Sequence, residues 1–202
     1  MTLPKGDHGP LNVTQKARHR IMAGLGWDPA GKAKLSDKIE KAMGGKKTHH
    51  DLDLACFVYD SHNTFISVVS PNQAQDIDAS GKIYHSGDNV AGFGDGDDEQ
   101  VSVELKDLPT DIHHILFIAK IQTGHDFYEV ADPEIHLTDG FSNDTLLETP
   151  INHEEGHNKD VFVFAHIYRS GESWQLHHVA EYLCSEENEQ WHEELSRFLT
   201  IK

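Results

Sequence analysis

The chain contains 202 residues, with 34 Asp or Glu against 17 Lys or Arg, so its formal net charge is -17 with histidine neutral. An acidic surface without a basic stripe repels phosphates, which excludes nucleic acid and anionic membrane surfaces as expected partners and favours cations. The length predicts one domain, over residues 1–202, with enough chain to bury a sizeable core. Wholly apolar runs such as Ile115 to Ala119 are too short for membrane insertion.

The part of the chain before residue 50 carries one helical pattern. Apolar residues recur there at helical spacing, and two glycines end the run: Leu35, Ile39, Ala42, Met43, Gly44 and Gly45. This pattern predicts a short amphipathic helix within residues 30–50. Ahead of it, the segment from Gly24 to Pro29 reads as a turn, and the segment from Leu11 to Val13 reads as a short strand.

From residue 51 the pattern changes to short strands joined by turns. Apolar residues at every second position predict a strand from Leu52 to Tyr59, and residues 60–63 form a predicted hairpin turn after it. Eight further segments are predicted strands: Thr64 to Val69, Lys82 to His85, Val101 to Leu105, Ile115 to Ile121, Glu134 to Leu137, Leu146 to Thr149, Val161 to Tyr168 and Trp174 to Val179. This pattern favours a mostly β chain, folded as an antiparallel β-sandwich, over alternating strands and helices.

The end of the chain returns to helical spacing. One apolar stripe consists of Trp191, Leu195, Phe198 and Leu199. Ser185 and two acids open the segment, which predicts a C-terminal helix over residues 185–202. In the first interpretation the stripe packs on the sandwich, and in the second it binds a partner protein.

The segment from His85 to Glu99 combines acids with glycines. Six acids and no Lys or Arg occur between Ile83 and Leu105: Asp88, Asp95, Asp97, Asp98, Glu99 and Glu104. Carboxylates held this close repel one another, so the folded loop needs a counterion or raised pKa values. Glycines at alternate positions permit a backbone that turns its carbonyls inward, and carboxylates with carbonyls are the oxygen ligands of Ca²⁺. Mg²⁺ fits less well because it demands stricter octahedral geometry.

A second acidic pair, Asp51 and Asp53, begins the first predicted strand after residue 50. Residues two apart in a strand project from one face, so strand pairing could place both carboxylates beside the loop. The candidate metal-binding residues are Asp51, Asp53, Asp88, Asn89, Gly92, Gly94, Asp97, Asp98 and Glu99. This set is large enough for more than one cation, and we expect two calcium ions. The alternative is a solvated acidic turn that binds nothing.

The loop resembles the signature of the TerD-like family of tellurium-resistance and general stress proteins. The matching motifs are Gly87-Asp88-Asn89 and Gly92-Phe93-Gly94-Asp95-Gly96-Asp97-Asp98-Glu99 in the loop, Gly24-Leu25-Gly26-Trp27-Asp28 and Asp51-Leu52-Asp53 upstream, and Ile167-Tyr168-Arg169 downstream. The resemblance extends over residues 11 to 182. Residues 30–50 look like an insertion, and Ala55 and Ala91 stand where the family often has Ser and Thr. The two alanines remove hydroxyl groups and leave the carboxylates in place.

The resemblance implies a calcium-binding β-sandwich of a bacterial stress or tellurite-resistance system, with no established catalytic activity. Its implied partners are calcium ions and other proteins of a stress-resistance complex. The sequence itself shows no apolar signal core at its N-terminus, and its two cysteines, Cys56 and Cys184, cannot form a disulfide framework. We therefore expect a cytoplasmic protein.

A competing motif, His153-Glu154-Glu155-Gly156-His157, matches the zincin pattern, in which a helix places two histidines around Zn²⁺ with the Glu as base. Pro150 lies just before it and Val161 begins a predicted strand, so the segment reads as a loop. A zinc-dependent hydrolase that uses His153, Glu154 and His157 is the alternative function. Direct binding of the tellurite oxyanion would need a basic pocket that the sequence does not indicate.

The chain contains 16 histidines, and three adjacent pairs occur among them: His49-His50, His113-His114 and His177-His178. They are interpreted either as metal-binding or pH-sensing groups, or as part of an acidic surface that is rich in histidine. Adjacent residues of a strand point to opposite faces, so such a pair cannot chelate one ion together.

Overall fold

The computed structural model describes residues 3–28, 50–90, 92, 96–152, 154–185 and 191–200, where eleven strands form two antiparallel sheets. In spatial order the six-stranded sheet contains β1 (His8–Pro10), β11 (Ser173–Leu183), β10 (Val161–Ser170), β7 (His114–Ile121), β3 (Leu52–Tyr59) and β4 (Phe65–Val69). The five-stranded sheet contains β5 (Ile83–His85), β6 (Glu99–Glu104), β2 (Arg20–Asp28), β8 (Ala131–Asp139) and β9 (Thr145–Pro150).

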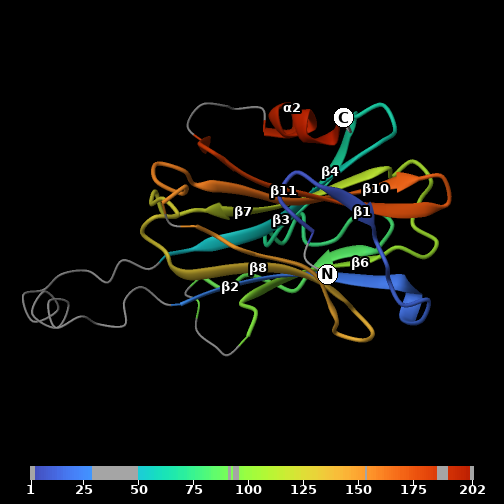
Figure 1. Cartoon of the computed structure of the whole chain (residues 1–202), viewed down its shortest axis with the longest axis horizontal. Coiled ribbons are helices and arrows are strands. Elements are labelled where there is room, and N and C mark those ends of the chain that lie inside the picture. Colours follow the sequence, from blue (N-terminus) through green and yellow to red (C-terminus); the bar gives the residue numbers. More distant parts are fainter. Residues whose placement is uncertain are drawn as a thin grey trace, which may run out of the picture.

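The two sheets lie face to face as two layers, and one hydrophobic core fills the space between them (Figure 1). Side chains alternate along a strand, so every second residue of β3 from Leu52 to Val58 enters this core. Leu25 of β2 and Ile135 of β8 enter it from the other sheet. The predicted mostly β fold with two antiparallel sheets is confirmed.

The C-terminal segment packs on the outer face of the six-stranded sheet. The helix α2 (Trp191–Leu195) continues into a 3₁₀ helix, η3 (Ser196–Leu199), and Leu195 and Leu199 are buried in a cluster with Leu116 of β7. Tyr59 donates a hydrogen bond of 2.9 Å from its hydroxyl to the carbonyl oxygen of His192. Packing of the C-terminal stripe on the sandwich is therefore confirmed (Figure 1). Within the described ranges, no helix has the length and apolar character needed to cross a membrane.

The glycine-rich segment before residue 29 corrects one expectation. Gly24 to Asp28 lie inside β2, between β6 and β8 in the five-stranded sheet, so the predicted turn is wrong. A Cβ atom on Gly24 would lie 2.3 Å from Oδ2 of Asp97. The glycine therefore marks the close approach of another segment rather than a change of chain direction.

Two further expectations concern the N-terminal part. The short strand expected at Leu11 to Val13 is wrong in position, because the strand β1 covers His8–Pro10. β1 adds to the edge of the six-stranded sheet beside β11. The helix predicted within residues 30–50 falls on positions that, apart from His50, lie outside the described residues.

Four imidazole rings lie next to one another across the outer face of the six-stranded sheet; we call His8, His177, His166 and His114 the histidine row. In the strand register His8 pairs with His177, and His177 pairs with His166. The rings of His8 and His177 are stacked with their centroids 3.9 Å apart, and Nδ1 of His114 lies 3.0 Å from Nε2 of His166. Ile167 follows His166 in β10 and faces the core. Adjacent residues of a strand point to opposite faces, so His166 and the rest of the row face outward.

The row predicts a loss of stability in acid. Burial, together with neighbouring histidines, lowers the pKa of His166 well below its ordinary value and that of His177 to about 4. The unfolded chain binds these protons near pH 6.5 and the folded chain only at lower pH. The contribution of the row to the free energy of unfolding should therefore be fully retained above about pH 6.5 and fall as the pH falls towards 4.

Denaturant unfolding in chelator-containing buffer between pH 7.5 and pH 4 checks this expectation. The variant His177→Gln should lose less stability over that range than the wild type, because one proton-linked group has been removed. His62→Gln, in an exposed hairpin turn, serves as the control and should keep the wild-type pH dependence. An unchanged pH dependence in His177→Gln would contradict the assignment.

Candidate metal centre

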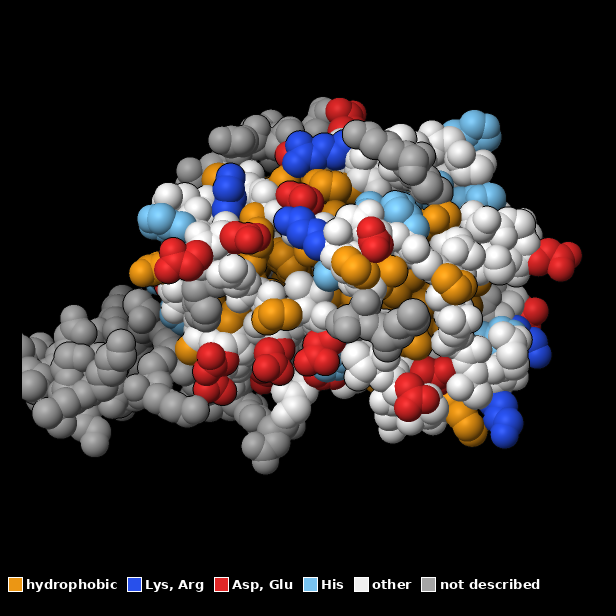
Figure 2. All heavy atoms as spheres, in the orientation of Figure 1, with side chains coloured by type: hydrophobic (Ala, Val, Ile, Leu, Met, Phe, Trp, Pro, Cys, Tyr) orange, Lys and Arg blue, Asp and Glu red, His pale blue; other side chains and the backbone are white. Residues whose placement is uncertain are grey.

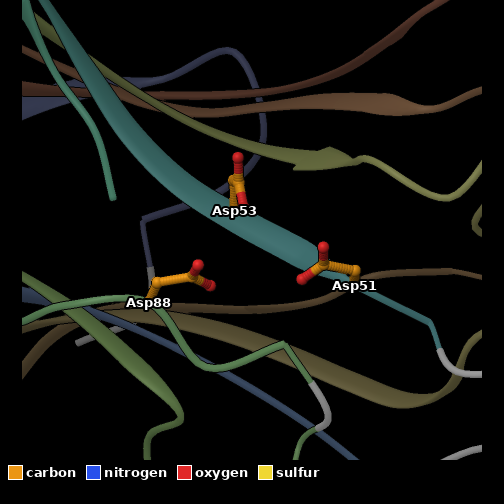
Figure 3. A group of neighbouring side chains, drawn as sticks. All are labelled: Asp51, Asp53 and Asp88. Atoms are coloured by element: carbon orange, nitrogen blue, oxygen red, sulfur yellow. The ribbon is translucent and has the colours of Figure 1, made fainter. Parts of the chain in front are cut away.

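Three carboxylates converge at the start of β3. One oxygen each from Asp51, Asp53 and Asp88 lies within 4.8 Å of the other two, and we call these residues the acidic triad. Asp51 and Asp53 are half-buried and Asp88 is exposed. Figure 3 shows Asp53 on β3 and Asp51 just before that strand begins, with Asp88 extending toward them from the loop after β5. The spacing of two residues explains why the first two side chains share a side.

The loop reaches this position because the first half of β3 has an open edge. Within the described residues β4 pairs only with Cys56 to Tyr59, so the amide of Leu54 has no strand partner on that side. The fully buried carboxylate of Glu99 takes this place: its Oε2 accepts the Leu54 N–H at 2.7 Å. Its Oε1 accepts the N–H of Asn89 at 3.2 Å. Glu99 begins β6, so one side chain connects the two sheets and the loop.

The buried carboxyl group of Glu99 faces a buried imidazole. The Nε2 atom of His85 lies 3.3 Å from Oε2 of Glu99, and both side chains are inaccessible to solvent. Nδ1 of His85 accepts the N–H of Gly87 at 3.0 Å, so a neutral ring carries its proton on Nε2, toward the carboxylate. Nε2 of His85 makes no hydrogen bond with a described residue, so the N–H groups of Leu54 and Asn89 are what compensate for placing the carboxylate in the interior.

A second set of contacts fixes the loop to β2. Asp98 accepts the backbone N–H of Trp27 at 3.0 Å and the side-chain amide N–H of Asn89 at 2.8 Å. The indole of Trp27 donates to the carbonyl oxygen of His50 at 3.0 Å. Gly92, with φ of +60°, lies so close that a Cβ atom there would be 2.6 Å from the indole nitrogen. These residues position the loop against β2.

Asp97 points away from the acidic triad. Its Oδ1 lies 3.3 Å from Nε2 of His136 on β8, and its Oδ2 accepts a hydrogen bond of 2.9 Å from Gln100. Burial opposes ionisation of Asp97, but the contacts with His136 and Gln100 hold its pKa below the ordinary value. The space left by Gly24 accommodates this orientation.

The nine residues predicted from sequence therefore separate into groups. Asp51, Asp53 and Asp88 come together, whereas Asn89, Gly92, Asp98 and Glu99 hold the loop through contacts with the two sheets. Asp97 faces His136, and Gly94 lies outside the described residues. Sequence reasoning did not identify Gln122, whose amide donates to Oδ2 of Asp53 at 2.5 Å. No pattern marks that residue, since it is a lone amide at the end of a predicted strand.

The acidic triad is electrostatically strained without a cation. Burial raises the pKa of Asp53 to about 6; Gln122 opposes this shift, and the nearby carboxylates add to it. Burial and the charges of Asp88 and Glu99 also raise the pKa of Asp51. The Oδ1 atom of Asp51 is buried and has no hydrogen-bond partner among the described residues. Acidic side chains are spread over the face in Figure 2, so close spacing rather than negative charge alone distinguishes the triad.

The donor chemistry of the triad is that of a hard cation. It offers carboxylate oxygens, and it contains neither the thiolates nor the imidazoles typical of Zn²⁺ sites. The zincin-like segment differs from a zincin helix: residues 154–158 form turns, and His157 contacts Asp126 with its Nδ1 3.2 Å from Oδ2. Its first histidine, His153, lies outside the described residues.

Comparisons with known proteins agree with the sequence motifs. The sequence model of the TerD domain matches residues 1–186. The chain is 26% identical over 186 residues to stress response protein SCP2 of Bacillus subtilis, covering 90% of this chain and 92% of that protein. It is 31% identical over 139 residues to tellurium resistance protein TerZ of Serratia marcescens, covering 69% of each. The crystal structure of a telluride resistance protein (TerD) homologue from Streptomyces coelicolor A3(2) is similar with a TM-score of 0.66, at 18% identity, over 82% of this chain and 90% of that chain.

Neutralising one triad carboxylate should stabilise the metal-free protein. With a folded pKa of about 6 against 3.8 unfolded, Asp53 makes folding less favourable as the pH rises through that range. We expect Asp53→Asn to raise the free energy of unfolding at pH 7.5 by about 1 kcal/mol, after allowing for solvent screening of this half-buried group. Denaturant unfolding in chelator measures the change. Asp144→Asn, an exposed turn residue, should have no effect, and destabilisation by Asp53→Asn would contradict the account.

Removing the bridging carboxylate should have the opposite effect. Glu99→Ala leaves the amides of Leu54 and Asn89 without their buried partner. Each unsatisfied buried group costs about 1–3 kcal/mol, so we expect a clear loss of stability. The exposed Glu134→Ala on β8 should change stability by less than about 0.5 kcal/mol. A loss in Glu99→Ala as small as in Glu134→Ala would show that the bridge is not important for the fold.

Proposed function

This chain belongs to the TerD family, and we propose that it is a calcium-binding, non-enzymatic protein of a bacterial stress or tellurite-resistance system. The observation that carries the proposal is the acidic triad, in which three carboxylates approach one another at the open edge of β3. Relatives named for tellurium resistance and for stress response support the biological setting. A cytoplasmic location is part of the same proposal.

Calcium is the cation that this donor set favours. Ca²⁺ takes six to eight oxygens at 2.3–2.6 Å in flexible geometry, and carboxylates bind it through one or both oxygens. Three carboxylates therefore supply three to six ligands, and water or backbone carbonyls supply the rest. Mg²⁺ requires near-ideal octahedral geometry at 2.0–2.1 Å and usually retains several waters. We place the first ion between Asp51, Asp53 and Asp88.

We place a second ion beside Asp98 at the other side of the loop. Burial and the neighbouring charges of Asp97 and Asp28 raise the pKa of Asp98, and a cation there would relieve the same repulsion. Calcium at both positions would hold the loop between β3 and β2. The ordered loop would then present one defined surface to a protein partner, which is the role we assign to the ions.

Calorimetric titration of chelator-treated protein with Ca²⁺, and with Mg²⁺ and Zn²⁺ in parallel, tests the proposal. The wild type should bind Ca²⁺ saturably, and a concentration of 100 times the dissociation constant should stabilise the fold by about 2.7 kcal/mol. Asp88→Ala removes an exposed ligand, so it should weaken Ca²⁺ binding at least tenfold while leaving the fold intact.

Asp111→Ala, an exposed loop acid beside the Tyr59 end of β3, at the opposite end from the triad, is the matched control and should bind Ca²⁺ like the wild type. Wild-type Ca²⁺ affinity in Asp88→Ala would overturn the triad site. Two ions per chain in the wild type and one in Asp88→Ala would support both positions. A single ion lost in Asp88→Ala would support the triad and reject the second position.

A further inference from the structure

One sheet edge lacks the features that usually prevent another strand from pairing with it. Edge strands expose unpaired backbone groups, and most are protected by shortness, charge or proline. Among the described strands, β1 and β5 have three residues each, and β9 contains Glu148 and ends in Pro150. The remaining edge strand, β4, consists of Phe65-Ile66-Ser67-Val68-Val69 and has neither charge nor proline. Its register against β3 shifts at Ile66, whose side chain is exposed.

The backbone of Val68 faces away from β3. Along an antiparallel strand, successive residues direct their N–H and C=O groups to alternate sides. The N–H of Gln122 donates to the carbonyl oxygen of Asp51 in the register of β7 and β3, so Asp51 and every second residue after it, including Phe57, face β7. Phe57 pairs with Val68, which therefore directs its own N–H and C=O to the open side. Among the described residues, no backbone group from another segment bonds to Val68 on that side.

The open stretch of this edge has a defined end. The next residue that faces away from β3, Ser70, donates its N–H to the carbonyl oxygen of Gln75 at 3.0 Å, so the turn after β4 closes the edge there. Phe65 to Val68 remain open, which is about 13 Å at ~3.3 Å per residue. The edge strands β1 and β5 are no longer than this, so an added strand of three or four residues fits.

A groove lies beside the start of the open stretch. It is located between the β3–β4 hairpin and the C-terminal segment and has a volume of about 370 Å³; its lining residues are Asn63, Thr64, Phe65, His192, Glu193 and Ser196. The ring of Phe65 has Tyr59 and His192 beside it, with centroids 5.8 Å and 4.9 Å away. An aromatic ring and a carboxylate in one groove suit a Lys or Arg side chain, because its stem packs on the ring while its charge meets the carboxylate.

The charges around β4 favour a basic partner over a second copy of this chain. Residues 60–81 contain three acids, Asp60, Asp76 and Asp78, and no Lys or Arg. Two copies would each bring a net charge of -17, and this repulsion opposes their association. A partner that carries Lys or Arg meets opposite charge instead, which also speeds its approach.

From these observations we propose that β4 is a docking edge for an extended segment of a basic protein, which adds to the six-stranded sheet as one more strand. The backbone of this segment pairs with Val68, and one of its Lys or Arg side chains enters the groove beside Phe65. Side chains alternate along a strand, so basic and apolar residues alternate in the segment that fits best. The acidic triad lies at the other end of β3, so the docking edge does not depend on calcium.

Fluorescence anisotropy with a labelled synthetic peptide of alternating Val and Arg residues tests the docking edge, at an ionic strength of ~0.15 M that screens distant charges. The wild type should bind this peptide saturably and should not bind a peptide of alternating Val and Glu. Val68→Pro removes the outward N–H, and Ile66→Lys adds a like charge at an exposed position, so each should weaken binding at least tenfold. Amide exchange measured by NMR should show that the Val68 N–H becomes protected when the peptide is added.

Two controls separate the edge from general attraction to an acidic protein. Phe141→Lys makes the same change of charge at an exposed apolar residue of the β8–β9 turn, at the far edge of the other sheet, and should bind the peptide like the wild type. Asp88→Ala should also bind it, so failure of the calcium proposal does not affect this test.

Two results would overturn the proposal. The first is equal peptide binding by the wild type, Val68→Pro and Ile66→Lys, or an unprotected Val68 N–H in the complex. The second is a dimer of the free chain, observed by sedimentation, that Val68→Pro converts to a monomer, because the occupant of the edge would then be a second copy.

Discussion

The arrangement of the acidic site depends on one buried carboxylate. Glu99 begins a strand of the five-stranded sheet. Its side chain accepts hydrogen bonds from the N–H of Leu54, which has no strand partner on that side of the other sheet, and from the N–H of Asn89 in the loop. This contact closes an edge that β4 leaves open and brings the loop onto β3. Asp88 thereby approaches Asp51 and Asp53, and three negative charges share a small space. The fold creates repulsion that a cation relieves, which is the physical basis of the proposed calcium site.

The outer face of the six-stranded sheet consists of two parts with different chemistry. One part is apolar and is covered by α2 and η3, whereas the adjacent part carries the histidine row, in which Nδ1 of His166 and Nδ1 of His177 have no hydrogen-bond partner among the described residues. The acidic triad and the histidine row therefore lie at opposite ends of β7 and differ in chemistry, with carboxylates at one end and imidazoles at the other.

Local patterns in the sequence predicted much of this arrangement, and contacts between distant segments account for the rest. The period of two placed Asp51 and Asp53 on one face without any tertiary information. Gly24 was misread as part of a turn because its reason, the side chain of Asp97, lies 73 positions away in the chain. The different orientations of Asp97 and Asp98 follow from the contacts that each makes with β8 and β2. Composition alone does not contain that information.

The histidine row shows the same limit more clearly. Adjacent histidines were correctly expected to face opposite ways in a strand, as His177 and His178 do. The row needs two pairings of strands that are not consecutive, β1 with β11 and β7 with β10, and a bulge between Val163 and Ala165 that shifts which residues of β10 face outward. Neither the register nor the bulge is encoded in a local pattern, so His166 could not be placed beside His114 before the fold was known.

A crystal structure of the protein grown with calcium, with anomalous diffraction to locate the ions, tests the central claim most directly. The account predicts an anomalous peak between the carboxylates of Asp51, Asp53 and Asp88, at 2.3–2.6 Å from at least one oxygen of each. Calcium bound elsewhere, with the three carboxylates turned apart and separately solvated, would contradict it.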